Sequence, residues 1–279
     1  MTPGRWPVGR LAALVAIFVG IAVVLQTVRS PHWSHVAPGV EFGTLNGEPW
    51  CRAGSSTVAL LRLDPELVKI GMRHYRREGG RRPPRLAEWM ARSGAIAAFN
   101  AGQYYPDLGY MGLFVSDGEV VSRRLHPEFR GALVAEPVGD SARRARVIDL
   151  EHDPLDPKRL AWREVAQSFM LFERGGGERV RKSEQVAART AVGEDAHGRI
   201  VVAVSEGGYT LWEFGQMLQR SPLELEHALS MDGGREAQLL VRGERMRYAS
   251  FGAWSKAREA PDGSADQVPL PAVIVVTPR

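Results

Sequence analysis

The sequence predicts an α+β fold: a twisted, largely antiparallel or mixed β-sheet with packed helices, preceded by one N-terminal transmembrane helix. Three observations favour this class. The N-terminus carries an uncharged apolar stretch, several apolar runs are joined by tight-turn dipeptides, and two segments repeat their apolar residues at helical spacing. Strands joined by hairpins, with helices between them, are typical of α+β proteins.

The transmembrane helix is predicted over residues 11–28, which contain no charged side chain. At about 1.5 Å per residue, a helix of this length spans about 27 Å, close to the thickness of a hydrocarbon core. Arg5 and Arg10 precede it, whereas Arg29 is the only Lys or Arg between it and Arg52. Because positive charge stays in the cytoplasm, we expect a single-pass signal-anchor with the C-terminal domain periplasmic or extracellular.

A cleaved signal peptide is the alternative for the same stretch, and it would make the protein secreted. Such a peptide has a shorter apolar run and ends in a small-x-small cleavage site. Here the run continues to Gln26-Thr27-Val28 without such a site. The sequence therefore favours the uncleaved anchor.

The predicted domain boundaries follow from this topology. We expect a cytoplasmic N-terminus over residues 1–10, the anchor over 11–28, a juxtamembrane segment over 29–57 and one domain over 58–279. The last segment is long enough to bury a single large hydrophobic core. Cys51 is the only cysteine, so no intrachain disulfide stabilises the fold.

Arginines give the chain its basic character, with a pI of about 9.4 and clusters within residues 76–85 and 143–146. Such clusters suit contacts with anionic lipid or anionic polysaccharide. No aromatic residues alternate with these arginines, as they do in platforms that stack nucleic-acid bases. We therefore expect no nucleic-acid partner, and a solvated arginine-rich surface is the simplest explanation of the clusters.

The first part of the domain predicts two strands, a helix and a buried strand. Residues 58–70 hold two apolar segments around Asp64-Pro65, which indicates two strands joined by a turn. Residues 84–92 have apolar side chains at helical spacing, and Ser93-Gly94 ends that helix. The uninterrupted apolar run 95–99 then predicts a buried strand.

A second helix lies between hairpins in the remaining part. Thr210 and Glu213 have the spacing of a capping box, in which each side chain satisfies a backbone donor of the other residue. Other segments are predicted as strands and hairpins from their apolar runs and tight-turn dipeptides: residues 113–121, 190–204, 228–231, 239–246 and 273–276.

Several kinds of site are not supported. The seven histidines are scattered, and no cysteine pair is available, so we expect neither a metal site nor a cofactor. No Gly-x-Ser-x-Gly elbow of a serine hydrolase occurs. Gly175-Gly176-Gly177 lies in a polar stretch and is better explained as a turn than as a phosphate-binding loop.

Polar residues follow several of the predicted strands directly. Asn100 follows the apolar run 95–99, Arg189-Thr190 opens a hairpin arm, and Asp232 precedes Gly233 and Gly234. Loops at strand ends display functional groups, and glycine lets the backbone approach a ligand closely. Each residue taken alone also has a structural explanation, such as a turn or a solvated charge.

The order of these segments resembles the phosphodiester glycosidase family over about residues 58–276. The similar segments are 98–102, 167–171, 188–193, 210–218, 229–234 and the closing strand 269–274. The family's Asn-Gly-Gly-Phe-Phe-like segment falls on Asn100 to Tyr104, and its Arg-Thr segment on Arg189 and Thr190. Its Leu-Asp-Gly-Gly-Gly-Ser-Ser segment falls on Met231 to Ala237. Residues 58–279 are therefore expected to be a phosphodiester-glycosidase-like domain.

This sequence departs from the family pattern in two places. Ala101 replaces a glycine and Gln103 replaces an aromatic residue, although Tyr104 and Tyr105 follow. Arg235-Glu236-Ala237 stands where the family has Gly-Ser-Ser. A charged pair in place of small side chains changes the volume and charge of that loop, and with them the substrate or the activity.

The resemblance implies roles for individual residues. Asp232 would face the developing positive charge or act as nucleophile or base, Arg189 would bind the phosphate, and Asn100 would hold a sugar hydroxyl or the Asp232 carboxylate. Further substrate contacts are expected from Gly102, Tyr104, Thr190, Glu206, Gly233, Gly234, Arg235 and Glu236, with Tyr209 and Asp107 at the rim.

Three functions are compatible with these observations. The first is a membrane-anchored hydrolase that cleaves the sugar–phosphate bond of sugar-1-phosphodiesters in envelope glycans or glycolipids. The second is a catalytically inactive glycan-binding protein that assists exopolysaccharide assembly or export. The third is a basic scaffold on the membrane surface. Asn100, Arg189 and Asp232 favour the first, so the expected partners are a phosphorylated sugar or anionic polysaccharide, and the membrane through the N-terminal helix.

Overall fold

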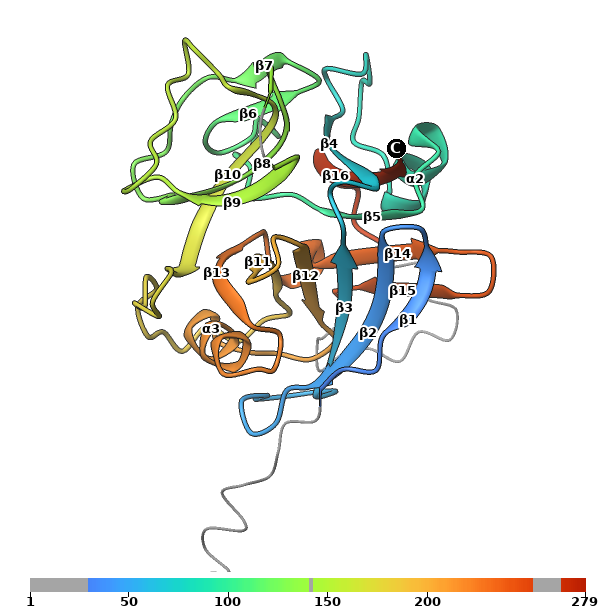
Figure 1. The fold of residues 1–279 in the computed structure, drawn as a ribbon, viewed down its shortest axis with the longest axis vertical. Coiled ribbons are helices and arrows are strands. Elements are labelled where there is room, and N and C mark those ends of the chain that lie inside the picture. Colours follow the sequence, from blue (N-terminus) through green and yellow to red (C-terminus); the bar gives the residue numbers. More distant parts are fainter. Residues whose placement is uncertain (1–29, 141–142, 253–266) are drawn as a thin grey trace, which may run out of the picture.

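Two antiparallel β-sheets form the protein (Figure 1). The computed structural model describes residues 30–140, 143–252 and 267–279. The first sheet has the spatial order β1 (Ser34–Ala37), β2 (Val40–Asn46), β3 (Thr57–Leu63), β12 (Ile200–Ser205), β11 (Thr190–Asp195), β13 (Leu225–Ser230), β10 (Trp162–Phe172), β6 (Phe114–Ser116) and β7 (Glu119–Ser122), and β10 also pairs with β8 (Gly131–Pro137), which pairs with β9 (Ala145–Asp149).

The second sheet is smaller. Its spatial order is β15 (Arg247–Phe251), β14 (Gln238–Arg242), β5 (Ala97–Asn100), β16 (Ala272–Pro278) and β4 (Val68–His74). The chain passes from the first sheet to the second between β3 and β4, so these two consecutive strands belong to different sheets.

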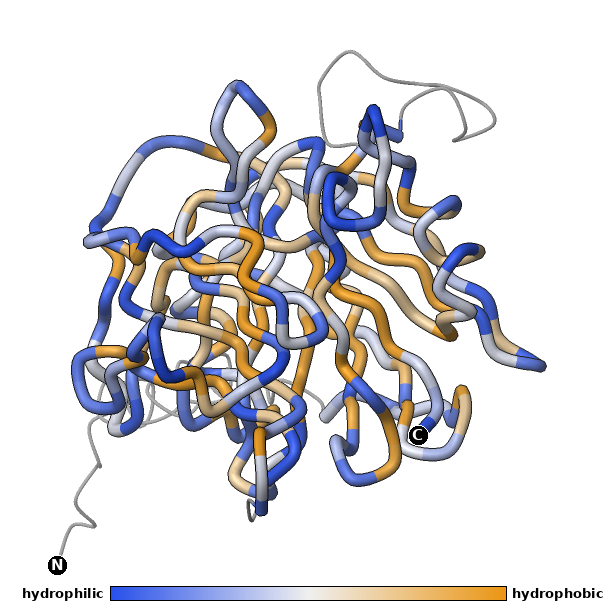
Figure 2. The backbone as a smooth tube through the Cα atoms, turned by 90° about the horizontal axis from the view of Figure 1, so that it is seen from above, coloured by the Kyte–Doolittle hydropathy of each residue, from blue (hydrophilic) through white to orange (hydrophobic). Residues whose placement is uncertain are grey.

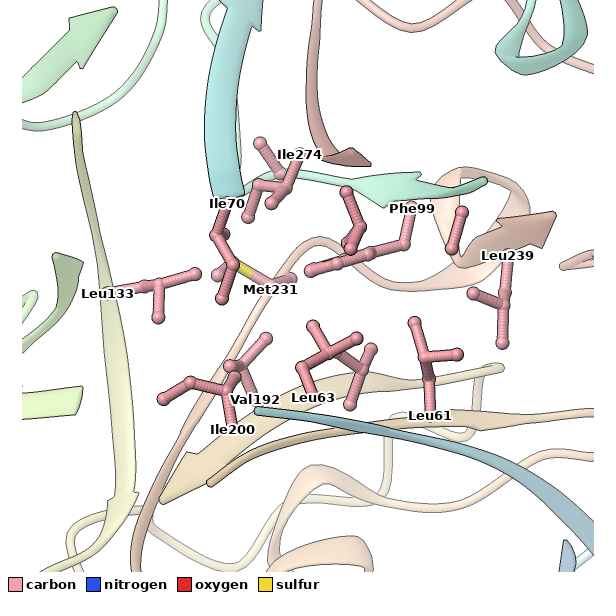
Figure 3. Close-up of a cluster of buried hydrophobic side chains, with 14 of the residues drawn as sticks. Leu61, Leu63, Ile70, Phe99, Leu133, Val192, Ile200, Met231, Leu239 and Ile274 are labelled. Carbon is pink, nitrogen blue, oxygen red and sulfur yellow. The ribbon is translucent and has the colours of Figure 1, made fainter. Parts of the chain in front are cut away.

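The main hydrophobic core lies between the two sheets. Figure 3 shows Leu61 and Leu63 of β3 opposite Phe99 of β5 and Leu239 of β14, with Met231 near the centre. Apolar positions concentrate along the interior strands and hydrophilic positions along the outer loops (Figure 2). Burial of apolar surface in this layer, at about 25 cal/mol per Å², is the main stabilising contribution.

Several strands are buried on both faces. In β3, Leu61 and Leu63 enter the core between the sheets, whereas Val58 and Leu60 pack on the opposite side. Side chains alternate between the two faces of a strand, so a strand covered on both sides reads as a continuous apolar run. The run TVALLRL of β3 follows this rule.

Two short α-helices cover the outer faces of the sheets. Helix α2 (Leu86–Ser93) packs Trp89 against Val273 and Val275 of the second sheet, and Gly94 ends it in the left-handed region, with φ of 64°. Helix α3 (Leu211–Gln219) packs Phe214 and its neighbours on the first sheet. Both helices were predicted, and the capping box of Thr210 and Glu213 is present.

The predicted α+β class with packed helices is wrong, because the protein is mostly β. Among the described residues, α2 and α3 have only eight and nine residues, and the core lies between sheets rather than beneath a helical layer. The prediction missed the strands between residues 131 and 172. In β10 the buried Glu164 and Gln167 accept backbone hydrogen bonds from Met72 and Leu113, and these polar residues interrupt the apolar pattern.

The structure describes only part of the predicted N-terminal segments. Residues 11–28, the predicted anchor, lie outside the described residues. Within residues 30–140, 143–252 and 267–279, neither α-helix has the length and apolar character needed to span a bilayer. The predicted juxtamembrane segment 29–57 contributes β1 and β2, and β2 pairs with β3 along its whole length.

Loss of the α3 cap provides a test of local stability. Thr210 Oγ1 accepts the backbone N–H of Glu213 at 3.2 Å, so Thr210→Ala leaves a buried helix donor without this partner. We expect a decrease of about 1 kcal/mol in the free energy of unfolding, measured by urea denaturation. Thr210→Ser keeps the hydroxyl and should retain most of the stability; an equal loss in both variants would contradict the capping role.

Candidate functional site

Three segments that are far apart in the sequence meet at one end of the core. The backbone N–H of Met231 donates to Thr190 O at 2.9 Å, and that of Asp232 donates to Ala101 O at 3.1 Å. Met231 itself is buried between the sheets (Figure 3). The core therefore anchors the residue directly before Asp232, and the loops after β5 and β13 lie beside the start of β11.

The side chain of Asn100 forms hydrogen bonds to all of these segments. Its side-chain oxygen accepts hydrogen bonds from Thr190 Oγ1 at 2.8 Å and from Gln238 N at 3.1 Å. Its nitrogen donates to Asp232 O at 2.9 Å and to Ala101 O at 3.1 Å. Because Asn100 is 1% exposed and uses both amide atoms internally, it positions the Asp232 loop rather than binding a sugar hydroxyl.

Asp232 is a partly buried acid with an altered pKa. The backbone N–H of Gly233 donates to Asp232 Oδ1 at 2.9 Å. Burial, with a smaller contribution from the Glu236 carboxylate, raises the pKa of Asp232 to about 7 against the opposing effects of the Gly233 N–H and Arg189. The carboxyl group therefore carries a proton for much of the time near neutral pH.

Glu236 is the second carboxyl group of the site. The 3₁₀ turn η1 (Gly234–Glu236) brings it back toward Asp232, and Gly234 allows this turn through its φ of 70°. Tyr104 Oη donates to Glu236 Oε1 at 3.0 Å. Burial and Glu236 raise the pKa of Tyr104, so its phenol stays protonated and orients the carboxylate.

Arg189 supplies the positive charge. It is 8% exposed, and its guanidinium donates to Tyr209 O at 3.0 Å and to Gln185 O at 2.6 Å. Burial lowers the pKa of Arg189, and Asp232 opposes this effect. A Cβ atom at position 233 would lie 2.9 Å from Ala188 O and 3.3 Å from Arg189 Nη1, so glycine is required beside the guanidinium.

Tyr110 belongs to the site but was not predicted. Its hydroxyl donates to Gln167 O at 2.9 Å and accepts the N–H of Gly102 at 3.2 Å. A Cβ atom at Gly102 would lie 2.5 Å from that hydroxyl, which explains the glycine. Burial and the nearby Asp232 raise the pKa of Tyr110. No sequence motif marks Tyr110, and its place in the site follows only from the structure.

Two of the predicted residues lie apart from this cluster. Glu206 accepts hydrogen bonds from Tyr248 Oη at 2.8 Å and Ser55 Oγ at 3.0 Å, and no bond links it to Asp232 or Glu236. Asp107 is exposed and accepts the N–H of Gly109.

Two more predicted residues lie close to the cluster but contribute no side-chain contact to it. Arg235 is exposed and forms no ion pair within the described part of the chain. Tyr209 contributes its backbone carbonyl to Arg189, while its hydroxyl donates to Ser56 O.

A separate group of possible metal ligands occurs among the described residues. Asp149, His152 and Glu173 present ligand atoms within 4.8 Å of one another. Arg179 donates to Asp149 Oδ2 at 3.0 Å and also bonds Glu173. The guanidinium therefore already supplies a cation to both carboxylates, and the site around Asp232 is distinct from this group.

Comparisons with known proteins agree with the arrangement of the fold. The zebrafish N-acetylglucosamine-1-phosphodiester α-N-acetylglucosaminidase catalytic domain, auto-inhibited by its pro-peptide, is 16% identical, with a TM-score of 0.60 over 92% of this chain and 91% of that one. A hypothetical protein from Synechocystis is 13% identical, with a TM-score of 0.63 over 91% of this chain and 64% of that one. At these identities the similarity concerns the fold alone.

The sequence itself identifies the family. A search of curated proteins finds no match. The family model for phosphodiester glycosidases matches residues 93–277, a range that contains Asn100, Arg189, Asp232 and Glu236. This confirms the predicted resemblance, and the chain belongs to the phosphodiester glycosidase family of hydrolases.

Proposed function

We propose that the protein hydrolyses the bond between the anomeric carbon and the phosphate oxygen of sugar-1-phosphodiesters. The observation that carries this proposal is a partly buried Asp232 with a raised pKa, placed beside a second carboxyl group and a buried arginine. A pair of carboxyl groups in different environments is the usual equipment for cleaving glycosidic bonds.

The charges suit an anionic phosphodiester. Protonated Asp232 adds no negative charge to the site, so Arg189 can attract the phosphate through its remaining guanidinium donors. As the carbon–oxygen bond breaks, Asp232 donates its proton to the departing phosphate oxygen. The electron pair of that bond leaves with the phosphate monoester, which binds to Arg189.

Glu236 stabilises the sugar side of the transition state. The breaking bond leaves positive charge on the anomeric carbon, and the Glu236 carboxylate held by Tyr104 opposes that charge. A water molecule then adds its oxygen to the anomeric carbon and transfers one proton to the Asp232 carboxylate, which restores the protonated acid. Glu236 replaces a small residue of the family pattern, so this assignment is particular to this sequence.

The substrate is proposed to be an envelope glycan or glycolipid outside the cytoplasm. Arg5 and Arg10 before an uncharged apolar stretch support export of the domain. Protease added to intact cells should digest the domain if it lies on the outer side of the cell. Protection that persists after the outer membrane is opened would place it in the cytoplasm.

The proposed bond cleavage can be tested with isotopically labelled water. Residues 30–279 are incubated with a methyl N-acetylglucosamine-1-phosphodiester in H₂¹⁸O, and the products are analysed by mass spectrometry. Carbon–oxygen cleavage places ¹⁸O on the sugar, whereas a phosphodiesterase places it on the phosphate. Label on the phosphate, or no turnover of several sugars by the folded protein, would reject the proposal. An identically purified Asp232→Asn variant sets the background.

The pH dependence follows from the protonation of Asp232. With a pKa of about 7, its proton is present below that pH and is lost above it. We expect kcat/KM to be highest below about pH 7 and to decrease at higher pH, measured from initial rates in constant-ionic-strength buffers. A rate that instead rises through pH 7 would assign Asp232 as nucleophile or base.

Glu236→Gln offers a matched control for this profile. The negative charge of Glu236 contributes to the raised pKa of Asp232. Without this charge, the remaining activity should decrease at a lower pH than the activity of the wild type. If the rate of Glu236→Gln falls at the same pH as that of the wild type, the pH dependence does not arise from the interaction between Asp232 and Glu236.

The inactive glycan-binding protein is the second candidate. The replacement of Gly-Ser by Arg235-Glu236 favours it, because the family's small side chains are absent there. Binding of anionic polysaccharide that survives Asp232→Ala, without turnover of any sugar-1-phosphodiester, would support this function over hydrolysis.

A further inference from the structure

A cleft of about 510 Å³ is lined by Arg189 but not by Asp232 or Glu236. Its volume lies within the range of roughly 300–1,000 Å³ typical of small-molecule sites. Residues from β10, from the loop that precedes β11 and from the segment before β8 line it, among them Arg130, Phe169, Arg179, Arg181, Gln185 and Arg189. The hydrolysis of a simple sugar-1-phosphodiester leaves this space unused.

Arg189 joins the cleft to the catalytic cluster. It lines the cleft and also acts on the Asp232 carboxyl group. A phosphate bound to Arg189 with its sugar at Asp232 therefore directs its other ester group toward the cleft. This places the aglycone, the part of the substrate beyond the scissile phosphate, against β10.

Arginines outnumber carboxylates among the side chains that line the cleft. Four arginines and two glutamates line it. Arg179 is held by Asp149 at 3.0 Å and by Glu151 and Glu173, so it braces the wall of the cleft. Arg181 is exposed and forms no ion pair within the described ranges.

Away from Arg179, the arginines that line the cleft outnumber the carboxylates that line it. Arg130 lies 3.4 Å from Glu151, a carboxylate that it shares with Arg179, and its side chain is 54% exposed. Glu128, also exposed, is the second glutamate of the lining, and its carboxylate opposes an anionic ligand. Arg130 and Arg181 are therefore available to a ligand in addition to Arg189.

Apolar side chains also line the cleft. Phe169 and Met170 of β10 line it, and Phe169 packs on Phe129 with ring centroids 4.3 Å apart. An aromatic ring held in place in this way offers a surface for the apolar face of a sugar. A lining that combines guanidinium groups with apolar side chains matches a chain in which sugars alternate with phosphates.

We infer that this cleft is the aglycone subsite and that it takes an anionic glycan whose next unit carries a second phosphodiester. The inference rests on the proposed function, since it names the substrate class of the same site. The second phosphate would bind Arg130 and Arg181, while Arg189 holds the phosphate at the cleaved bond.

The test compares two substrates with the same sugar and scissile phosphate. One has a methyl aglycone, and the other has a sugar that carries a second methyl phosphodiester. We expect the wild-type kcat/KM to be about tenfold higher for the longer substrate, through a lower KM that rises with ionic strength. Arg130→Gln with Arg181→Gln should remove this preference and leave the methyl substrate unaffected.

Glu128→Gln is a control that removes a negative charge from the cleft, whereas the arginine variants remove positive charges. It removes the opposing carboxylate from the same cleft, so the preference for the longer substrate should be kept or increased. Equal kcat/KM for the two substrates, or a preference that survives the double arginine variant, would overturn the subsite while turnover of the methyl substrate sustains the proposed function.

A binding measurement tests the proposed subsite independently of catalysis. Calorimetric titration of the longer compound into the wild type and the double variant requires no turnover. Weaker binding by the double variant supports the subsite even if neither substrate is cleaved, a result that would reject only the proposed hydrolysis. Equal affinities would reject the subsite.

Discussion

Asp232→Asn is expected to lower kcat for a sugar-1-phosphodiester by about 10²–10⁴-fold. Asparagine keeps the size of the side chain and can still accept the Gly233 N–H at Oδ1, but it cannot donate a proton to the phosphate oxygen. The Asn100 bond to the Asp232 backbone is unaffected by the change, so the loop should keep its position. Initial rates of sugar release, with circular dichroism as a check of folding, provide the measurement.

A change of leaving group tests the role of Asp232 as an acid. A dinitrophenyl glycoside of the same sugar needs no proton for departure, so Asp232→Asn should approach wild-type rates on it. Asp107→Asn, at an exposed position outside the cluster, should retain wild-type activity on both substrates. An equally large loss with the activated glycoside would identify Asp232 as the nucleophile instead.

Arg189→Lys is expected to lower kcat/KM by about 10²–10³-fold. The guanidinium spends donors on Tyr209 O and Gln185 O and still presents Nη1 beside Gly233. A lysine ammonium is a single compact charge, and it cannot hold both carbonyls and a phosphate in this planar arrangement. Steady-state kinetics with the methyl phosphodiester measure the loss.

Arg181→Lys is the matched control for Arg189→Lys. Arg181 lines the aglycone cleft without an ion pair in the described part of the structure, so the methyl substrate should be cleaved as by the wild type. An Arg189→Lys variant with near-wild-type kcat/KM would exclude Arg189 as the phosphate ligand, because its rigid donor geometry would then be dispensable.

Local features of the chain were predictable because local interactions determine them. The capping box at Thr210 and the hairpin of β11 and β12 depend on neighbouring residues, and both are present in the structure. The run 95–99 was recognised as a buried strand for the same reason, and β5 begins within it. Asn100, Arg189 and Asp232 were singled out by their places at strand ends.

Other features depend on pairing between distant segments. The amide of Asn100 is satisfied by Thr190, Gln238 and Asp232, and no local pattern specifies those partners. Tyr110 reaches the site only because its hydroxyl bonds Gly102 and Gln167 across strands. The helical layer was wrongly expected because two amphipathic helices do not reveal that a second sheet covers the core.

The place of β16 in the second sheet determines when the protein can fold. This strand pairs with β4 on one side and β5 on the other, and Val273 and Ile274 fill the packing on its two faces. A ribosome-bound chain that has not yet released residues 272–278 exposes two unpaired strand edges, which are sites of aggregation. Asn100, at the end of β5, pairs with Val273 of β16, so its final environment forms only once β16 has joined the sheet.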